Sequence, residues 1–307
     1  MALAERDATQ SVTYADRSGD AFMRGVTRTI HADALHQAGR RAEAETRFRE
    51  AEQMQAESQP AYPLLYSLRG FLYCDLLLAA PERAAWQKVV QGFSPPKRPQ
   101  SETGTQGEEP PSDGLKPETT LASCRAVSQR AAQTLKWVTG KLGLLDEALN
   151  HLTLGRAALY EAILSHSDIR VPSAELDSAV AGLRRAGTAH MIPHALLTRA
   201  WLRFLTGAHT GPESAQEDLD EAWEIAERGP MKLFLADIHL YRARLFGVRS
   251  AECGVRNEEA KYPWDQHPDG SPRGPEDDLA AAEKLIHTCG YHRRDEELAD
   301  AKAAFGI

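Results

Sequence analysis

Two histidine clusters are the residues whose types are best suited to metal or acid–base chemistry. His190 and His194 are four residues apart, which places two imidazoles on one face of a helix. No glutamate accompanies them as in the zinc motif HExxH, and His287, Cys289 and His292 also lack a ligand spacing. Because a zinc site needs three or four converging ligands, these groups predict surface or capping histidines, with no metal and no cofactor.

Nucleophilic catalysis has no support in the sequence. There is no GxSxG motif, and the four cysteines are scattered without a CxxC pair or a protease signature. Reduced thiols that pack in the core of a cytoplasmic protein are therefore expected. The sequence predicts no catalytic residues. An enzyme with a site in a helical cleft remains as an alternative, and the histidine clusters are its only basis.

Arginine and tyrosine residues form the strongest candidate binding groups. The candidates are Tyr66, Arg69, Arg199, Arg203, Tyr241, Arg242 and Arg244. By spacing, Tyr66 and Arg69 share one helical face, and so do Arg199 and Arg203. The other three candidates lie on a single predicted helix. Guanidinium groups donate two parallel hydrogen bonds to a carboxylate, which would suit an acidic peptide. The alternative is that these arginines pair with acids on neighbouring helices of the same chain.

One aromatic motif lies in a polar stretch near the C-terminal end. Tyr262, Pro263 and Trp264 are surrounded by charged residues, glycine and proline. An exposed tryptophan would mark a contact site. The alternative is that Trp264 packs back onto the helices and anchors its loop, since burial of a large aromatic side chain stabilises a fold by a few kcal/mol, roughly 2–3. The sequence favours the second interpretation.

The elements that position these residues are predicted by a recurring pattern of small residues. Ala32, Ala44 and Ala51 would let two helices approach closely, Gly39 lies where the turn must fall, and Phe48 fills the space between the helices. Similar spacings recur along the chain. They involve Ala148, Leu152 and Gly155, then Ala200, Gly207, Ala215, Leu219 and Ala222. The pattern indicates repeated pairs of antiparallel helices.

Composition agrees with a helical protein and excludes several classes of partner. The chain has 307 residues, 42% hydrophobic and 26% charged, with a net charge of −8. This charge offers no basic footprint for nucleic acid. No apolar run approaches the roughly 18 residues that span a bilayer, and the N-terminus lacks the apolar core of a signal peptide. A cytoplasmic protein that binds neither nucleic acid nor membrane is expected.

The chain is predicted to be a single helical array over residues 1–307 with two insertions. Residues 92–120 hold six prolines and four glycines but few large apolar residues, which is typical of a mobile linker. Residues 249–274 are similarly rich in charge, glycine and proline and predict an irregular loop. Before the first insertion, helices are expected over residues 63–78 and 82–90. A charged helix is expected to cap the C-terminal end.

These residues resemble the tetratricopeptide repeat family over most of the chain, the two insertions excepted. The resemblance implies an all-α fold, a right-handed α-α superhelix whose concave face binds a protein or peptide. The family's clamp for a peptide terminus uses lysine and asparagine. Asp33, Trp201 and Asp237 occupy one of its key positions here, so recognition of a chaperone tail is not expected.

The chain also resembles the degenerate helical sensor arms of bacterial STAND signalling proteins. The segments DLDEAWEIAERG, KYPW and GYHRRDEELADA support this resemblance, whereas the GxxxxGK[ST] motif of the ATPase core is missing. The leading hypothesis is therefore a non-catalytic protein- or peptide-binding module with an acidic partner. A ligand-sensing regulatory subunit of a bacterial signalling or defence system is the alternative.

Overall fold

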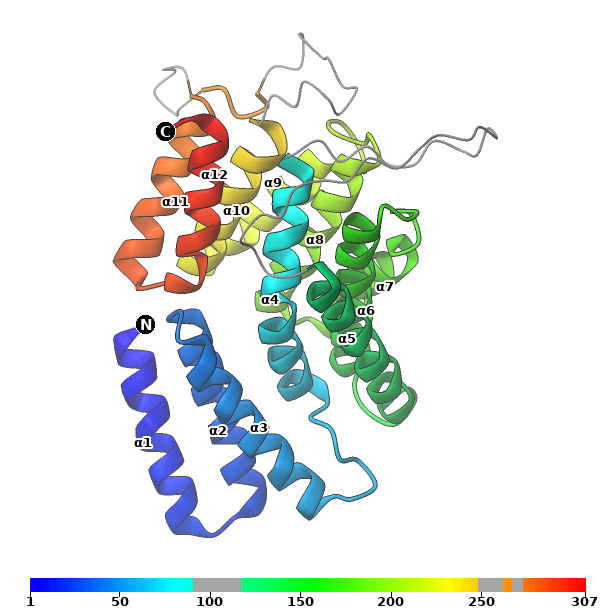
Figure 1. The fold of residues 1–307 in the computed structure, drawn as a ribbon, viewed down its shortest axis with the longest axis vertical. Coiled ribbons are helices and arrows are strands. Elements are labelled where there is room, and N and C mark those ends of the chain that lie inside the picture. The colour runs from blue at the N-terminus through cyan, green and yellow to red at the C-terminus, as the bar shows by residue number, and fades with distance from the viewer. Residues whose placement is uncertain (91–116, 248–261, 267–272) are drawn as a thin grey trace.

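The computed structural model describes residues 1–90, 117–247, 262–266 and 273–307, and within these ranges the chain is helical without β-strands (Figure 1). The predicted all-α class is therefore confirmed. The α-helices are α1 (Ala2–Ser18), α2 (Ala21–Gln37), α3 (Arg41–Ser58), α4 (Ser67–Val90), α5 (Pro117–Val138), α6 (Leu144–Ser165), α7 (Ser173–Ala186), α8 (Ile192–Leu205), α9 (Ala215–Arg228), α10 (Lys232–Phe246), α11 (Pro275–Cys289) and α12 (Asp295–Phe305). Two 3₁₀ turns, η1 (Ala189–Met191) and η2 (His292–Arg294), precede α8 and α12.

The helices make two kinds of contact with one another. Each helix contacts its successor in the chain, and the even-numbered helices also contact one another, from α2 to α4 and onward to α12. The end of the chain returns to its beginning, because η2 contacts α2 and α12 contacts α4. Figure 1 shows α4 near the centre of the molecule, with α11 and α12 above the upper ends of α1 and α2.

The α2–α3 pair has the internal packing that its small residues predict. Ala32, Ala44 and Ala51 are fully buried between the helices, and Phe48 stacks on Tyr73 of α4 with ring centroids 5.0 Å apart. Gly39 turns the chain with a φ of +79°, a conformation that a side chain would disfavour. The absence of side-chain bulk at these positions is what brings the backbones together.

A second close approach joins α6 and α7. A Cβ placed on Gly155 would lie 2.5 Å from Leu176 Cδ2, so a larger residue where α7 crosses α6 would have to displace the Leu176 side chain. Ala148 and Leu152 of the same helix are buried in the core, as the repeated spacing predicts. Helix packing through small residues is thus shared by the first and the middle parts of the chain.

The helix boundaries predicted around Pro81 are wrong, and so is the predicted start at Pro63, because α4 begins at Ser67 and Tyr66 precedes it. The chain forms one continuous helix, α4, through Pro81, where two helices were expected. Pro81 is buried, and Asp75 and Glu82 on either side of it form ion pairs with arginines of other elements. These contacts offset the hydrogen bond that proline removes from a helix. Helix α1, at the N-terminus, was not predicted at all.

The insertions lie mainly outside the described residues. Residues 92–116 of the predicted linker 92–120 lie outside the described residues, and Pro117 to Thr120 form the first turn of α5. Of the predicted loop 249–274, the structure describes residues 262–266 and 273–274. There Trp264 packs back on the helices as predicted: its Nε1 donates to Asp220 Oδ1 at 2.7 Å, and its ring meets Phe246 edge-on.

Candidate partner-binding surface

The centre of the molecule is occupied by buried ion pairs rather than by an open groove. Asp75 and Glu82 of α4 are both buried. Arg156 of α6 lies 2.7 Å from Asp75 Oδ1 through Nη1 and 3.0 Å from Glu82 Oε2 through Nη2. Arg293 of η2 bonds to both oxygens of Asp75. Although burial opposes ionisation, Arg293 and Arg156 hold the pKa of the Asp75 carboxyl well below its usual range.

The ion pairs continue from η2 into the last helices. Arg294 Nε lies 2.8 Å from Asp237 Oδ1 of α10, and its Nη1 lies 2.6 Å from Glu297 Oε1 of α12 and 3.0 Å from Glu82 Oε1. Arg244 of α10 reaches Glu297 Oε2 at 3.1 Å. With Asp75, Arg156 and Arg293 the cluster holds four carboxylates and four guanidinium groups, so its formal charge balances. We call it the central ion cluster.

The three candidates on α10 are all buried. Arg244 belongs to the central ion cluster, and Tyr241 meets the ring of Trp86 edge-on with centroids 5.2 Å apart. Arg242 lies between two indoles, 4.6 Å from the ring of Trp223 and 4.3 Å from that of Trp264. Each of these side chains has its partner within the chain, so none faces solvent in this structure.

Arg199 and Arg203 project together, as their spacing predicts, and both bond to the buried carboxylate of Asp218. Arg199 Nε and Nη2 lie 3.0 and 2.6 Å from the two Asp218 oxygens, and Arg203 Nη1 lies 3.0 Å from Oδ1. In the structure these two arginines therefore pair with an acid of the same chain, which was the alternative interpretation of the sequence. They line an open pocket of about 540 Å³ with Arg170, Ser173, Asp177, Leu202, Thr206 and Glu213.

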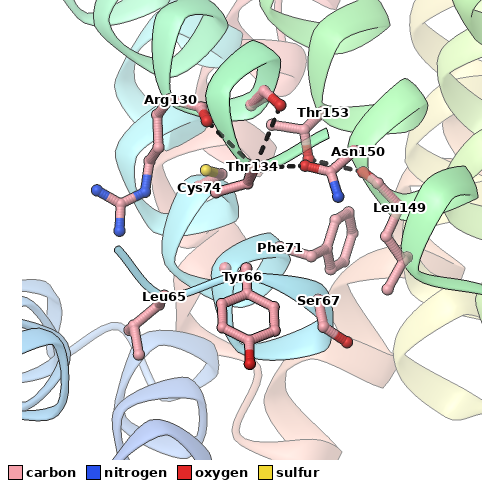
Figure 2. Close-up of a pocket in the computed structure, with 12 residues that line it drawn as sticks. Leu65, Tyr66, Ser67, Phe71, Cys74, Arg130, Thr134, Leu149, Asn150 and Thr153 are labelled. Atoms are coloured by element: carbon pink, nitrogen blue, oxygen red, sulfur yellow. Dashed lines mark hydrogen bonds between the residues drawn. The ribbon is translucent and has the colours of Figure 1, made fainter. Parts of the chain in front are cut away.

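Tyr66 borders a small cavity between the start of α4 and helices α5 and α6 (Figure 2). The cavity holds about 10 Å³, which is room for about one water molecule. Figure 2 shows the polar side chains of Thr134, Asn150 and Thr153 at its upper rim, where Thr134 Oγ1 donates to Asn150 Oδ1 at 2.6 Å. The size of this cavity excludes a ligand larger than water.

Arg69 differs from the other candidates because no carboxylate in the described part of the chain pairs with it. Its guanidinium lies between aromatic rings, 5.4 Å from the centroid of Phe22 of α2 and 5.8 Å from that of Tyr66. Partial burial lowers the pKa of Arg69 from its ordinary value. The side chain is half-buried. Arg69 is thus a cation that contacts ring faces and has no anionic counterpart within the ranges that the structure describes.

Aromatic residues from α5 and from the segment before α4 contact Tyr66 beside Arg69. The ring of Trp137, at the end of α5, meets Tyr66 and Tyr62 edge-on with centroids 6.4 and 5.4 Å away. The hydroxyl of Tyr66 donates to Gln59 Oε1 at 3.4 Å. This aromatic support fixes one side of the Arg69 environment, so little ordering is needed when a ligand arrives.

Helix α2 presents a solvent-facing apolar stripe next to Arg69. Phe22, Val26 and Ile30 are spaced by four residues and therefore share one helical face. Phe22 is 59% exposed and Ile30 is 53% exposed, and Leu68 at the start of α4 is 41% exposed. We call Phe22, Val26, Ile30, Tyr66, Leu68 and Arg69 the α2–α4 surface. An exposed apolar stripe with a cation beside one of its residues is typical of an interaction site.

Sequence reasoning identified Tyr66 and Arg69 but not the apolar residues of α2. The sequence signal that could have identified them is a second apolar stripe on α2. One face of the helix carries Ala32 and Leu35, which are buried. Another face carries Phe22, Val26 and Ile30, which are not buried. A helix needs a single apolar stripe to pack on a core, so a second stripe indicates a further contact.

The histidines occupy separate environments. His194 lies between the rings of Phe71 and Phe234, with centroids 5.4 and 4.6 Å away, and burial lowers its pKa to about 3. His292 Nδ1 lies 2.9 Å from Asp295 Oδ2 at the surface. Among the described residues no three histidine, cysteine or acidic side chains converge in a way that could hold a metal ion.

Comparison with known proteins adds no family. No protein-family model, no curated protein and no solved structure matches the chain. In the described ranges, every helix is too short or too polar to cross a bilayer.

Proposed function

We propose that this chain is a non-catalytic protein- or peptide-binding module built as a right-handed α-α superhelix of tetratricopeptide type. Two features support this architecture. The even-numbered helices contact one another in order along the chain, and each is flanked by odd-numbered neighbours. The helix pairs approach through small residues such as Ala44 and Gly155, at positions where the repeat family also has small residues. The free, buried thiols of Cys74 and Cys124 support a cytoplasmic setting.

The observation that carries the proposed activity is Arg69. Of the arginines proposed as partner contacts, the others have carboxylate or buried aromatic contacts inside the chain. Arg69 contacts the rings of Phe22 and Tyr66, and no carboxylate of the described residues pairs with it. An acidic group of a partner would supply the missing counterion, and the guanidinium could donate two hydrogen bonds to it.

The apolar part of the α2–α4 surface would supply the remaining contact area. Phe22, Ile30 and Leu68 are large and exposed, and a partner side chain placed on them would be removed from water. Burial of apolar area contributes about 25 cal/mol per Å², and aromatic and arginine anchors contribute most of the energy in many interfaces. A mixed apolar and acidic segment fits this surface best.

A site-specific crosslinking experiment tests this proposal. A photoreactive phenylalanine replaces Ile30 in one preparation and Tyr14 in another. Tyr14 is exposed on α1 and serves as the matched control. After irradiation in cytosolic extract, we expect a discrete protein adduct at position 30 only, and the purified partner should bind Arg69→Gln at least tenfold more weakly than the native chain. Equal adducts at both positions, or none at position 30, would refute the proposal.

A further inference from the structure

The apolar stripe of α2 continues into a second unpaired charge. Asp33 and Gln37 lie on the same face as Phe22, Val26 and Ile30, by helical spacing. Gln37 Nε2 donates to Asp33 Oδ1 at 2.8 Å, and no lysine or arginine of the described residues forms an ion pair with Asp33. Asp33 is half-buried. The stripe therefore ends in a carboxylate that lacks a cation.

Arg69 marks the opposite end of the stripe. A Cβ on Gly25 would lie 3.5 Å from Arg69 Nη1, which places the guanidinium beside Gly25 of α2. Eight residues separate Gly25 from Asp33, a distance of about 12 Å at 1.5 Å per residue. A cation and an anion, each without a counterion among the described residues, thus lie about two helical turns apart, with Phe22, Val26 and Ile30 along the face between and beside them.

We infer that the α2–α4 surface binds an amphipathic helix of a partner protein, which places a carboxylate at Arg69 and a lysine or arginine at Asp33. This inference rests on the proposed function and specifies its partner. Charge complementarity selects the occupant, because a uniformly acidic segment would place a negative charge against Asp33 and a uniformly basic one a positive charge against Arg69.

The geometry of a helix meets these requirements in one element. Residues seven or eight apart lie on the same helical face about 10–12 Å apart, so an acid and a base at that spacing can reach Arg69 and Asp33 together. Apolar residues at the intervening positions of that face would pack on Val26 and Ile30 as one ridge on another. Helices that bind in the grooves of other proteins do so through anchor residues at such spacings, for example i, i+4 and i+7.

The desolvation of Asp33 is consistent with this arrangement. Burial raises the pKa of Asp33 to about 6, and Gln37 and the more distant Arg293 only partly oppose the effect. A carboxylate in such a setting gains more from a nearby ammonium or guanidinium group than one that is fully hydrated.

Designed peptides test the inference directly. The probes are 16-residue alanine-rich helices with leucines at i, i+4 and i+8, and with Glu and Lys eight residues apart. One probe has Glu first, a second has Lys first, and a third has Gln at both positions. Fluorescence anisotropy of labelled peptides measures affinity for the native chain, for Arg69→Gln and for Asp33→Asn. Arg17→Gln and Asp7→Asn, exposed changes on α1, control for net charge.

We expect one charged order to bind at least tenfold more tightly than the Gln probe. Arg69→Gln should abolish the advantage given by Glu and Asp33→Asn the advantage given by Lys, while the α1 controls change nothing. Thermal melting verifies that the variants fold. Charged probes that bind no better than the Gln probe, or variants that bind them like the native chain, would overturn the inference. A partner that crosslinks at position 30 despite such a result would leave the proposed function standing.

Discussion

At the scale of single residues, the role of an arginine in this protein depends on which carboxylate can reach it. Arg199 shares Asp218 with Arg203, and Arg244 shares Glu297 with Arg294. Arg69 has aromatic neighbours instead. Residues of one type and similar local spacing thus divide into structural and candidate binding groups, and this division follows from long-range packing.

A substitution at Ala44 tests the closest contact of the α2–α3 pair. Ala44 is fully buried against α2, so Ala44→Trp should destabilise the protein by roughly 1–3 kcal/mol or more through overpacking. Thermal melting followed by circular dichroism measures the effect. Ala42→Trp, at an exposed position of the same helix, is the control and should change stability by at most about 0.5 kcal/mol. Equal melting temperatures for the two variants would contradict the packing described.

The pH dependence of stability should reveal the unpaired Asp33. Its pKa is raised from 3.8 to about 6 in the folded state, so between these values the folded chain binds more protons than the unfolded chain. The contribution of Asp33 therefore favours folding at low pH and is lost as pH rises through about 6. Asp33→Asn keeps an acceptor for Gln37 but does not titrate, so it should be more stable than the native chain above pH 6.

The stability of Asp33→Asn has to be compared with that of the native chain at each pH, because the titration of His36 changes stability in the opposite sense. Burial, and the charge of Arg293, lower the pKa of His36 to about 4, which makes stability rise with pH between about 4 and 6.5. The melting temperature of Asp33→Asn minus that of the native chain cancels the histidine term. This difference should grow from pH 4 to pH 6 and then level off. A difference independent of pH would show that Asp33 titrates normally.

At the scale of elements, the α8–α9 pair is held by an ion pair as well as by apolar packing. Asp218 of α9 is buried and accepts two hydrogen bonds from Arg199 of α8. Arg203, one turn further along α8, reaches the same carboxylate. Substitutions at these arginines are therefore expected to report on the stability of the helix pair before they report on any partner.

Arg199→Glu should destabilise the protein by roughly 3–5 kcal/mol, because it leaves the buried Asp218 carboxylate beside a second negative charge. Chemical denaturation gives the change in the free energy of unfolding. Arg170→Glu is the matched control: Arg170 pairs with Asp168 at an exposed site and contributes at most about 1 kcal/mol. A normally stable Arg199→Glu protein would mean that the ion pair does not hold α8 and α9 together.

At the scale of the whole molecule, the central ion cluster joins distant parts of the chain. Asp75 and Glu82 are on α4, whereas Arg293 and Arg294 lie more than 200 residues later in η2. The same turn contacts α2. The last elements therefore do more than cap the array, as the sequence predicts for a charged terminal helix, because they supply the cations that neutralise the buried acids of α4.

Removal of Arg293 should weaken this connection. Arg293→Gln leaves Asp75 with Arg156 as its remaining arginine partner, and loss of one partner of a buried pair costs roughly 3–5 kcal/mol. The melting temperature should fall by roughly 5–10 °C. Arg83→Gln, which breaks a more exposed link between α4 and Asp300 of α12, should cost less than about 1 kcal/mol. Similar losses for both variants would show that the cluster adds nothing beyond a surface ion pair.

The sequence by itself determined the helical pairs and their close contacts. Small residues at 32, 44 and 51, and a glycine at position 39, act through local spacing, and the structure shows them buried or in the turn as predicted. Arg69 and Tyr66 could also be proposed from the sequence, since they are three residues apart, although Tyr66 lies just before α4 and not on it. Period and turn chemistry are properties of neighbouring residues, which a sequence displays directly.

Only the tertiary structure decided which charges are satisfied and which helices continue. The ion pairs of Glu82 explain how α4 passes through Pro81, and they involve Arg294, more than 200 residues away. The same long-range packing buries Tyr241, Arg242 and Arg244. It leaves Arg69 and Asp33, at two ends of one stripe, without ionic partners in the part of the chain that the structure describes. A charge is paired or unpaired according to distances across the fold, and those distances are not encoded in local spacing.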